Sequence, residues 1–283
     1  MERDLGYGFK QIAAALAADR VFFNSRFHQD EFLAAVRAVL DAVPDHAPSW
    51  VLDEIAGRSA VLPVGCDLRR LDGYRPGRRG GPPAEESGRW GRSADGPLIL
   101  WNQRWEYDKD PGTLFRGLYE LQDAGLPFRL ALAGANQGVP SAIFVEARER
   151  LAGQTVQWGR LQCFADYAAL LWQADMVVST ALHEFFGVAV VEALYCGCRP
   201  LLPHRLSYPE IVPPEAHSWA LYEPGRFAEA LAQSVRAFLA DPAAQQRRAD
   251  WQRTWVSPYD WGNLAPRYDD AIWRCWEGGS APE

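Results

Sequence analysis

The stretch Glu184–Gly197 reads Glu-Phe-Phe-Gly-Val-Ala-Val-Val-Glu-Ala-Leu-Tyr-Cys-Gly, and its pattern predicts a helix over residues 186–195 closed by Gly197. Glu184 precedes the helix and Glu192 lies two turns along it, so the pair spans about 10–12 Å at the ~1.5 Å rise of a helical residue. Two glutamates on a helix are ordinarily surface charge, but the residues around Glu192 are apolar. Because a carboxylate accepts two hydroxyl groups at once, the pair suits the diols of a nucleoside diphosphate sugar.

Strands and helices alternate on both sides of this helix. The expected strands cover residues 98–102, 128–133, 155–158, 175–179 and 199–202. The expected helices cover residues 141–151, 164–173, 186–195 and 226–239, and one more begins at Pro111 with Asp110 as its N-cap. This alternation predicts one complete, open, parallel sheet over residues 97–257. In such sheets ligands bind beyond the carboxyl ends of the strands.

Two of these strand ends carry residues that suit a diphosphate. Arg104 and Lys109 follow the first strand, five residues apart, and both can face one anion. Gly134 follows the second strand and permits a close backbone approach, with Asn136 two residues further on. We therefore expect phosphate contacts from the two cations and donor contacts from Gly134 and Asn136.

The strand over 175–179 leads into the quoted stretch. A helix that starts at Phe186 directs free N–H groups and a favourable dipole at an anion in the same crevice. Glu184 is expected to orient the hexose hydroxyls and Glu192 to hold the ribose, while His183 either donates to the sugar or packs as a loop residue. The remaining expected donor contacts of this segment are Phe185, Phe186, Gly187 and Val188.

Asp108-Lys-Asp110 has the spacing of a metal-binding Asp-x-Asp. Asp110 is better explained as a helix cap, and Lys109 favours phosphate over a cation. We therefore expect no metal site and no cofactor apart from the nucleotide-sugar donor.

The flanking regions are less regular. Residues 1–68 contain a short βα alternation, with strands expected at 20–24 and 59–64 and helices at 7–18 and 27–43, which predicts a partial α/β domain. Residues 69–96 hold seven arginines among many glycines and prolines, and are expected to form a solvated linker or to contact phosphate. Within them, candidate acceptor contacts are Arg75, Arg78 and Arg79.

Residues 258–283 are rich in aromatic side chains. They are expected to form a helix that packs back across the domains, with its rings in a core or, alternatively, serving as a platform for stacked bases.

The composition limits the function class. The net charge of −7 does not indicate a general nucleic-acid binder, although a local basic patch remains compatible with it. The five cysteines fit no zinc spacing and are expected to be free thiols. Since no apolar run approaches the roughly 18 residues of a membrane span and the N-terminus has no signal pattern, we expect a cytoplasmic protein without a membrane partner.

The two glutamates, together with Arg104 and Lys109, resemble the signature of group 1 retaining glycosyltransferases of the GT-B fold. The segment Val61–Asp67, Val-Leu-Pro-Val-Gly-Cys-Asp, is similar to the one that precedes the interdomain linker in that family. The resemblance implies a GT-B-type α/β fold with one complete Rossmann-like C-terminal domain and an incomplete N-terminal Rossmann-like portion. It also implies hexosyl transfer with retention and without an essential metal.

A narrower resemblance, to the tRNA-queuosine α-mannosyltransferase family, covers most of the chain. It is carried by Glu2–Phe9, Phe23–Ser25, Leu100–Pro111, Ser179–Gly187 and Tyr208–Ile211, and by phenylalanine where other group 1 enzymes have glycine after the first glutamate. The resemblance implies GDP-mannose as donor and the queuosine base of a tRNA anticodon as acceptor. Family members have a longer N-terminal half, so we expect part of the acceptor side to be missing.

Other functions remain open at this point. The chain could be a catalytically silent module that binds a nucleotide sugar or tRNA, a sugar-nucleotide epimerase on the same fold, or a glycosyltransferase with another small-molecule acceptor. The oligomeric state has no signature in the sequence.

Overall fold

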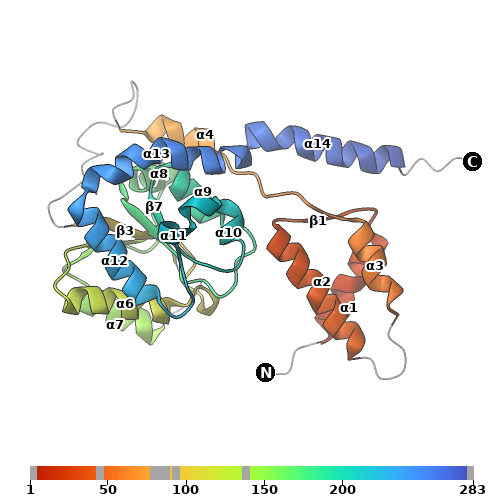
Figure 1. Ribbon diagram of the computed structural model, residues 1–283, viewed down its shortest axis with the longest axis horizontal. Helices are drawn as coiled ribbons and strands as arrows, with labels where there is room; N and C mark the ends of the chain where they lie inside the picture. Colours follow the sequence, from red (N-terminus) through yellow and green to blue (C-terminus); the bar gives the residue numbers. More distant parts are fainter. Residues whose placement is uncertain (1–4, 43–47, 77–89, 91–95, 136–140, 279–283) are drawn as a thin grey trace, which may run out of the picture. The chain divides into compact units, whose positions relative to one another are not determined.

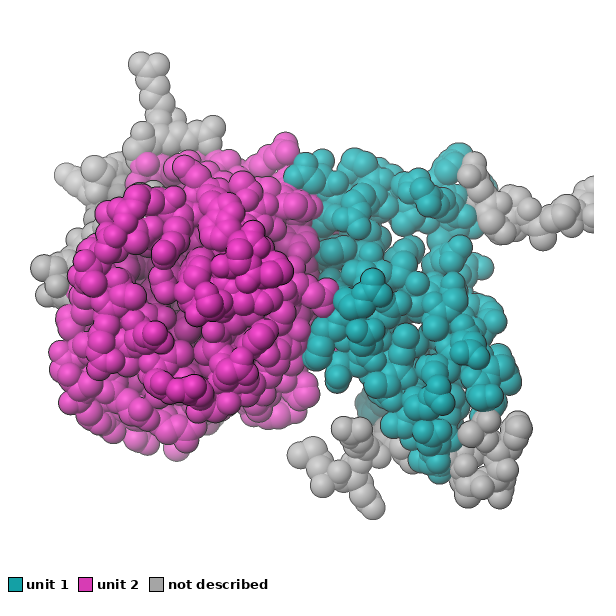
Figure 2. All heavy atoms as spheres, in the orientation of Figure 1, with its two compact units in different colours: residues 1–65, 262–283 teal, residues 66–261 magenta. Residues whose placement is uncertain are grey.

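The computed structural model describes residues 5–42, 48–76, 90, 96–135 and 141–278, and it divides into two compact units (Figures 1 and 2). Unit 2 spans Cys66–Trp261. Unit 1 consists of the described residues before Cys66 and after Trp261.

Unit 1 is a small α/β unit built on two parallel strands, β1 (Val21–Phe23) and β2 (Ser59–Val61). Three helices pack around them: α1 (Leu5–Ala17), α2 (Arg26–Asp41) and α3 (Trp50–Gly57). The helices bury a common apolar cluster formed by Ile12, Ala15, Val36, Leu40, Val51 and Ile55. The strands at both predicted places are confirmed, whereas α3 was not predicted and β2 ends three residues earlier than expected.

Unit 2 contains a six-stranded, fully parallel sheet. Its strands are β3 (Leu98–Trp101), β4 (Arg129–Leu132), β5 (Thr155–Trp158), β6 (Met176–Val178), β7 (Arg199–Pro203) and β8 (Leu221–Tyr222). They lie in the order β5-β4-β3-β6-β7-β8. The chain therefore moves outward from β3 in one direction and then, starting at β6, in the other. Such a reversal between β3 and β6 opens a crevice at the carboxyl ends of these two strands.

Helices cover both faces of this sheet (Figure 1). One face carries α6 (Pro111–Asp123), α7 (Ala142–Arg150) and α12 (Phe227–Ala240). The other carries α8 (Phe164–Gln173), α9 (Val188–Tyr195) and α13 (Pro242–Val256). Short helices α10 (Tyr208–Ile211) and α11 (His217–Ala220) lie between β7 and β8. The predicted open α/β sheet is confirmed.

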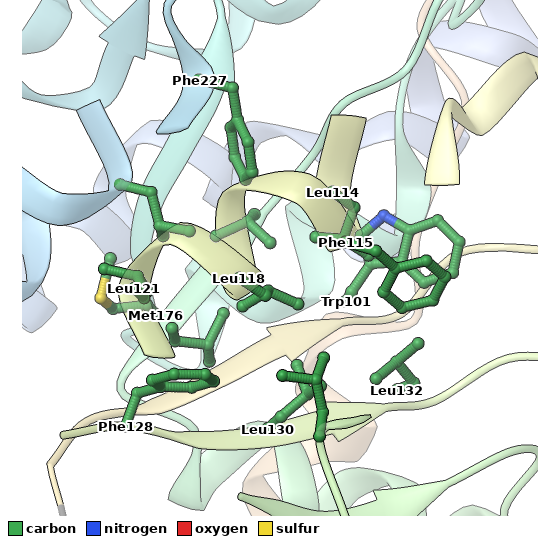
Figure 3. Packing of buried hydrophobic residues seen from close by; sticks show 14 of the residues in the cluster. Trp101, Leu114, Phe115, Leu118, Leu121, Phe128, Leu130, Leu132, Met176 and Phe227 are labelled. Carbon is green, nitrogen blue, oxygen red and sulfur yellow. The ribbon is translucent and has the colours of Figure 1, made fainter. Parts of the chain in front are cut away.

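The core of unit 2 lies between α6 and the sheet. Leu114, Leu118 and Leu121 recur at helical spacing on α6 and point onto the strands, as Figure 3 shows. Leu130 of β4 is fully buried beneath them. Because burying such a leucine contributes about 1.5–3 kcal/mol, this layer fixes the position of the helix and of the loop that precedes it.

The start of α6 follows the predicted capping pattern. The Oδ1 atom of Asp110 accepts a hydrogen bond from the Thr113 backbone N–H at 3.1 Å, and Pro111 occupies the first turn. Asp110 itself has φ 47°, in the left-handed region. The cap therefore turns the chain sharply between the β3 loop and the helix.

The first residues of the expected linker are folded, which differs from the prediction. Residues 66–76 group with unit 2 and form α4 (Leu68–Leu71) and the 3-10 turn η1 (Asp72–Tyr74). Leu68 and Leu71 are fully buried, so this part is not a solvated tether despite its arginines. Trp90 is also buried, and its backbone N–H donates to the Oε1 atom of Gln173 in α8. The remaining residues of the 69–96 stretch up to Asp95 lie outside the described ranges.

The tail forms the predicted helix, α14 (Trp261–Gly278). The Tyr268 hydroxyl donates to the Pro63 carbonyl at 2.9 Å, which ties the helix to unit 1. Trp273 and Trp276 are 60% and 74% exposed, so the expectation of core packing is wrong for these two rings, which lie past the contact made by Tyr268. Within the described ranges no helix is both long enough and apolar enough to cross a bilayer.

Candidate functional site

The loops that follow β3 and β6 meet at the crevice between these strands. The Leu182 N–H donates to the Asp108 carbonyl at 2.7 Å. The Thr180 hydroxyl reaches the carbonyl of Lys109 at 2.7 Å and that of Asp110 at 3.0 Å. These bonds bring two segments about 70 residues apart in the sequence into one rigid unit.

Lys109 is the cation at the centre of this unit. Its Nζ atom donates to the His183 carbonyl at 2.9 Å and lies 3.3 Å from Oε2 of Glu184 and 3.3 Å from Oδ2 of Asp108. The lysine side chain is only 9% exposed. A nearly buried ammonium between two carboxylates is held in one place, which suits a group that must meet a charge on a ligand.

Glu184 also shapes the start of α9. Its Oε1 atom accepts a hydrogen bond from the Phe186 N–H at 3.3 Å. Gly187 has φ 97° and ψ 51°, a conformation that residues with a Cβ rarely adopt, and it places Val188 as the first helical residue. Helix α9 thus begins two residues later than predicted, because Gly187 is left-handed. Its first N–H groups have no partner within the helix and remain donors for a ligand.

Glu192 lies on α9 in a second polar cluster. The Tyr167 hydroxyl donates to its Oε2 atom at 2.7 Å, and Asn102 Nδ2 donates to Tyr167 Oη at 3.1 Å and to the Ala189 carbonyl at 2.8 Å. Burial raises the pKa of Glu192, and the Tyr167 hydrogen bond partly offsets this rise. Burial and the Glu192 charge raise the pKa of Tyr167 well above its usual value, so the hydroxyl stays a donor.

Gly134 brings the end of β4 against the end of β3. A Cβ atom at this position would lie 1.9 Å from the Gln103 carbonyl oxygen, far inside van der Waals contact. Only glycine fits here without a backbone shift. Asn136, the other residue expected at this strand end, lies outside the described residues.

The remaining predicted residues are placed as follows. Arg104 is 64% exposed at its side chain and pairs with Glu106 at 2.9 Å, so the structure does not bring it against Lys109. Phe186 is buried against the Tyr259 ring at 5.0 Å, and its N–H is already bonded to Glu184. Exposed side chains near the crevice belong to His183, Phe185 and Val188.

Of the three candidate acceptor residues, the structure describes Arg75. The guanidinium of Arg75 lies over the Trp172 ring at 5.3 Å. Arg78 and Arg79 lie outside the described residues.

Sequence reasoning missed Asn102, Gln103 and Tyr167. Gln103 Nε2 donates to the Ser179 hydroxyl at 2.9 Å. Oδ1 of Asn102 and Oε1 of Gln103 are buried and have no hydrogen-bond partner among the described residues. The available signal was a polar Asn-Gln pair directly after a fully apolar strand. Buried amides ordinarily pair all their polar atoms, so the unpaired oxygens of this pair point to a ligand.

Asp110 caps α6, as predicted. Among the described residues there is no cluster of three histidine, cysteine or carboxylate ligands. All five cysteines are free, as expected.

Comparison with known proteins identifies the family. Residues 1–66 match the family model described as tRNA-queuosine alpha-mannosyltransferase N-terminal, and residues 84–254 match the model described as Glycosyl transferases group 1. A tRNA-queuosine alpha-mannosyltransferase of Drosophila melanogaster is 36% identical over 219 residues, covering 76% of this chain and 55% of the relative. The chain belongs to the tRNA-queuosine α-mannosyltransferase family of group 1 glycosyltransferases.

A more distant relative of this chain comes from Mycobacterium tuberculosis. It is a GDP-mannose-dependent alpha-(1-6)-phosphatidylinositol dimannoside mannosyltransferase, 26% identical over 74% of this chain and 51% of its own length. The chain thus spans about half the length of the curated relatives it matches.

Solved structures confirm the fold of this chain. The sucrose-phosphate synthase of Thermosynechococcus elongatus aligns with a TM-score of 0.72 at 22% identity, covering 98% of this chain and 63% of that one. Starch synthase IV of Arabidopsis thaliana aligns with a TM-score of 0.71 at 14% identity, covering 94% and 57%. The GT-B-type α/β fold is therefore confirmed.

Proposed function

We propose that this chain carries the donor site of a retaining glycosyltransferase, which transfers mannose from GDP-mannose to the queuosine base of tRNA. The observation that supports this most strongly is the placement of Lys109, Glu184 and Glu192 around one crevice at the point where the strand order reverses. The family adds the acceptor class, because the matched relative is named for queuosine in tRNA.

Lys109 and the N-terminus of α9 would bind the diphosphate. As the bond between sugar and phosphate breaks, negative charge builds on the departing diphosphate, and a fixed ammonium and free N–H groups stabilise it. The exposed guanidinium of Arg104 can turn from Glu106 towards the phosphates, since its present ion pair is a weak surface contact.

The two glutamates would hold the two ends of the donor. Glu192 accepts hydrogen bonds from the ribose diol, and Tyr167 keeps its carboxylate in place from the other side. Glu184 accepts from the hexose hydroxyls, with its orientation set by Lys109 and by the Phe186 N–H. His183 is exposed beside it and can contact the sugar or the leaving diphosphate.

The acceptor would attack the anomeric carbon on the face from which the diphosphate departs, so the configuration is retained. The bond from carbon to the diphosphate oxygen breaks as the bond to the queuosine hydroxyl forms, and the hydroxyl proton leaves with the diphosphate. The residues above need no metal ion to stabilise this charge. We place the reaction in the cytoplasm, where tRNA is available.

GDP-mannose is proposed as donor on two grounds. The mycobacterial relative is named as GDP-mannose-dependent, and the Drosophila relative is named as a mannosyltransferase.

The experiment is a transfer assay with the whole chain. Queuosine-containing tRNA is incubated with GDP-mannose, digested to nucleosides and analysed by mass spectrometry, with the anomeric configuration of the product read by NMR. We expect one added hexose on queuosine, in the α configuration, and none on tRNA that lacks queuosine or with UDP-glucose as donor. GDP binding without transfer would favour a silent binding module, and epimerised sugar nucleotide would favour an epimerase.

Glu184→Gln tests the site within the same assay. We expect at least a tenfold loss of transfer, because the amide neither balances Lys109 nor accepts as strongly from the sugar. Gly153→Ala is the control, since no atom lies within 4 Å of the added methyl group and the backbone there is not left-handed.

A further inference from the structure

Among the arginines of unit 2 that lie over aromatic rings, three form one face near the donor site. This arginine–aromatic face consists of Arg70, Arg75, Phe164, Trp172, Tyr195 and Arg253. Its residues come from α4, α8, α9 and α13, and Arg75 follows directly after η1, so five segments of the chain build it.

The first stack involves Phe164. The guanidinium carbon of Arg70 lies 3.8 Å from the centroid of its ring, and the Tyr74 ring meets the same ring edge-on at 5.7 Å. Arg70 is exposed, so its N–H groups face solvent while its plane rests on the ring. A guanidinium held in this way keeps its donors available for a phosphate.

The second stack centres on Trp172. Arg75 and Arg253 lie 5.3 and 5.0 Å from its ring centroid, and Arg253 is also 5.0 Å from the Tyr195 ring. The Trp172 indole N–H donates to the Leu71 carbonyl at 2.7 Å, which fixes the ring against the end of α4. The stack is therefore part of the folded unit and not a chance surface contact.

The charges of these arginines are not neutralised locally. Within the described part of the chain, Arg70, Arg75 and Arg253 have no carboxylate within 4.0 Å. Of the nearby acids, Asp260 pairs with Arg69, and Asp72 accepts from the neutral Tyr195 hydroxyl and keeps its negative charge. Asp67 is the exposed acid that remains close to α4 in sequence. Arg226 of α12, by comparison, is ion-paired with Glu229.

The face adjoins the donor site through α8. The Phe164 and Tyr167 rings lie 6.4 Å apart, and Tyr167 donates to Glu192. The Phe164 end of the face therefore lies one turn of α8 from Tyr167, which contacts the group proposed to hold the donor ribose.

We propose that the arginine–aromatic face binds RNA, with its guanidinium groups on phosphodiester oxygens and the exposed Arg70 plane available to an unpaired base. The inference rests on the proposed function, which supplies tRNA as the acceptor. Recognition of single-stranded RNA combines positive side chains with aromatic and guanidinium planes, and both are present here in one place. An acidic protein partner would need the positive charge of the arginines but not the aromatic and guanidinium planes.

The test measures tRNA affinity of the whole chain against salt concentration. Each phosphate contact contributes about 0.7–0.9 to the slope of log K against log [salt]. The double variant Arg70→Gln/Arg75→Gln should lower that slope by about 1.5, which changes the salt sensitivity between 50 and 200 mM by about eightfold. Arg70→Lys/Arg75→Lys should keep the slope, because it keeps the charge, but weaken binding because it loses the stacking.

The matched control is Arg150→Gln/Arg226→Gln. Arg150 also lies over a ring, that of Tyr119 at 4.1 Å, but it is paired with Asp123, and Arg226 is paired with Glu229. This control removes the same charge and should leave the slope unchanged. Thermal unfolding of each variant verifies that it is folded.

The outcomes separate this proposal from the proposed function. An unchanged slope in the Arg70/Arg75 variant overturns the face as an RNA site, even if mannose transfer is observed. A loss of GDP affinity equal to the loss of tRNA affinity overturns it as well, since the face would then belong to the donor site. If the Arg70/Arg75 variant binds poly-glutamate more weakly than the parent but binds tRNA equally well, the face binds an acidic protein and the proposal is overturned. Normal tRNA binding by the parent chain without mannose transfer rejects only the proposed function.

Discussion

Removing the ion pair between Lys109 and Glu184 is expected to lower the stability of unit 2 by more than a surface pair would. At the 3.3 Å between Nζ and Oε2, Coulomb's law gives about 5 kcal/mol for an effective dielectric constant of about 20. The side chains are 9% and 22% exposed, so both lose hydration on folding and the net coupling is smaller. Asp108 competes for the same ammonium at 3.3 Å. We expect a coupling free energy of about 2 kcal/mol, within the range of contacting pairs.

The assay is a double-mutant cycle of Lys109→Met and Glu184→Gln. The free energy of unfolding of all four proteins is measured in urea at pH 7, with tryptophan fluorescence as the probe. Lys109→Met alone should cost about 3 kcal/mol, because it leaves two partly buried carboxylates without their cation. Glu184→Gln should recover much of this loss when combined with it.

The control cycle uses Arg226→Gln and Glu229→Gln, a pair whose side chains are 63% and 64% exposed. Its coupling should be far smaller than that of Lys109 and Glu184, because solvent screens an exposed pair. A Lys109–Glu184 coupling no larger than that of the control pair would refute the account of a preorganised, water-excluded cation in the crevice.

Three further predictions concern neighbouring positions. Gly134→Ala should destabilise the protein by about 2 kcal/mol or more and abolish GDP binding, because its methyl group meets the Gln103 carbonyl; Gly153→Ala should do neither, and calorimetry measures both. Burial raises the pKa of Glu192. At pH values between its ordinary pKa and this raised pKa, the folded state binds more protons than the unfolded state, so the unfolding free energy falls as pH rises. Glu192→Gln removes this fall, so the stability of the variant relative to the parent should be greater at pH 7 than at pH 4, as urea titrations can test. Tyr167→Phe removes a hydrogen bond that lowers the pKa of Glu192, so the pH below which GDP affinity declines should move upward. An unchanged pH profile would contradict that arrangement.

The sequence predicted the regular elements of unit 2 well. The bounds of β5 and α8 agree with the expected residues 155–158 and 164–173. Helix α8 has a clear apolar periodicity, and β5 is bounded by clear turn residues, so local patterns suffice to locate them. The alternation predicted an open parallel sheet, because parallel strands linked by helices form this kind of sheet. The strand order, with its reversal between β3 and β6, comes from the structure.

Other features could not be predicted because they depend on distant residues. Leu68 and Leu71 are fully buried although the stretch around them is rich in arginine, since unit 2 provides an apolar surface that composition does not reveal. Tyr167 meets Glu192 from a helix 25 residues earlier, and the Arg104 side chain turns to Glu106 instead of joining Lys109. Only the folded structure shows such choices of partner.

The most direct test of the central claim is a crystal structure of the chain with GDP. We predict the diphosphate at the N-terminus of α9 within hydrogen-bond distance of Lys109, and the ribose hydroxyls on the Glu192 carboxylate. GDP bound elsewhere on unit 2, or bound in the crevice without contact to either residue, would contradict the account.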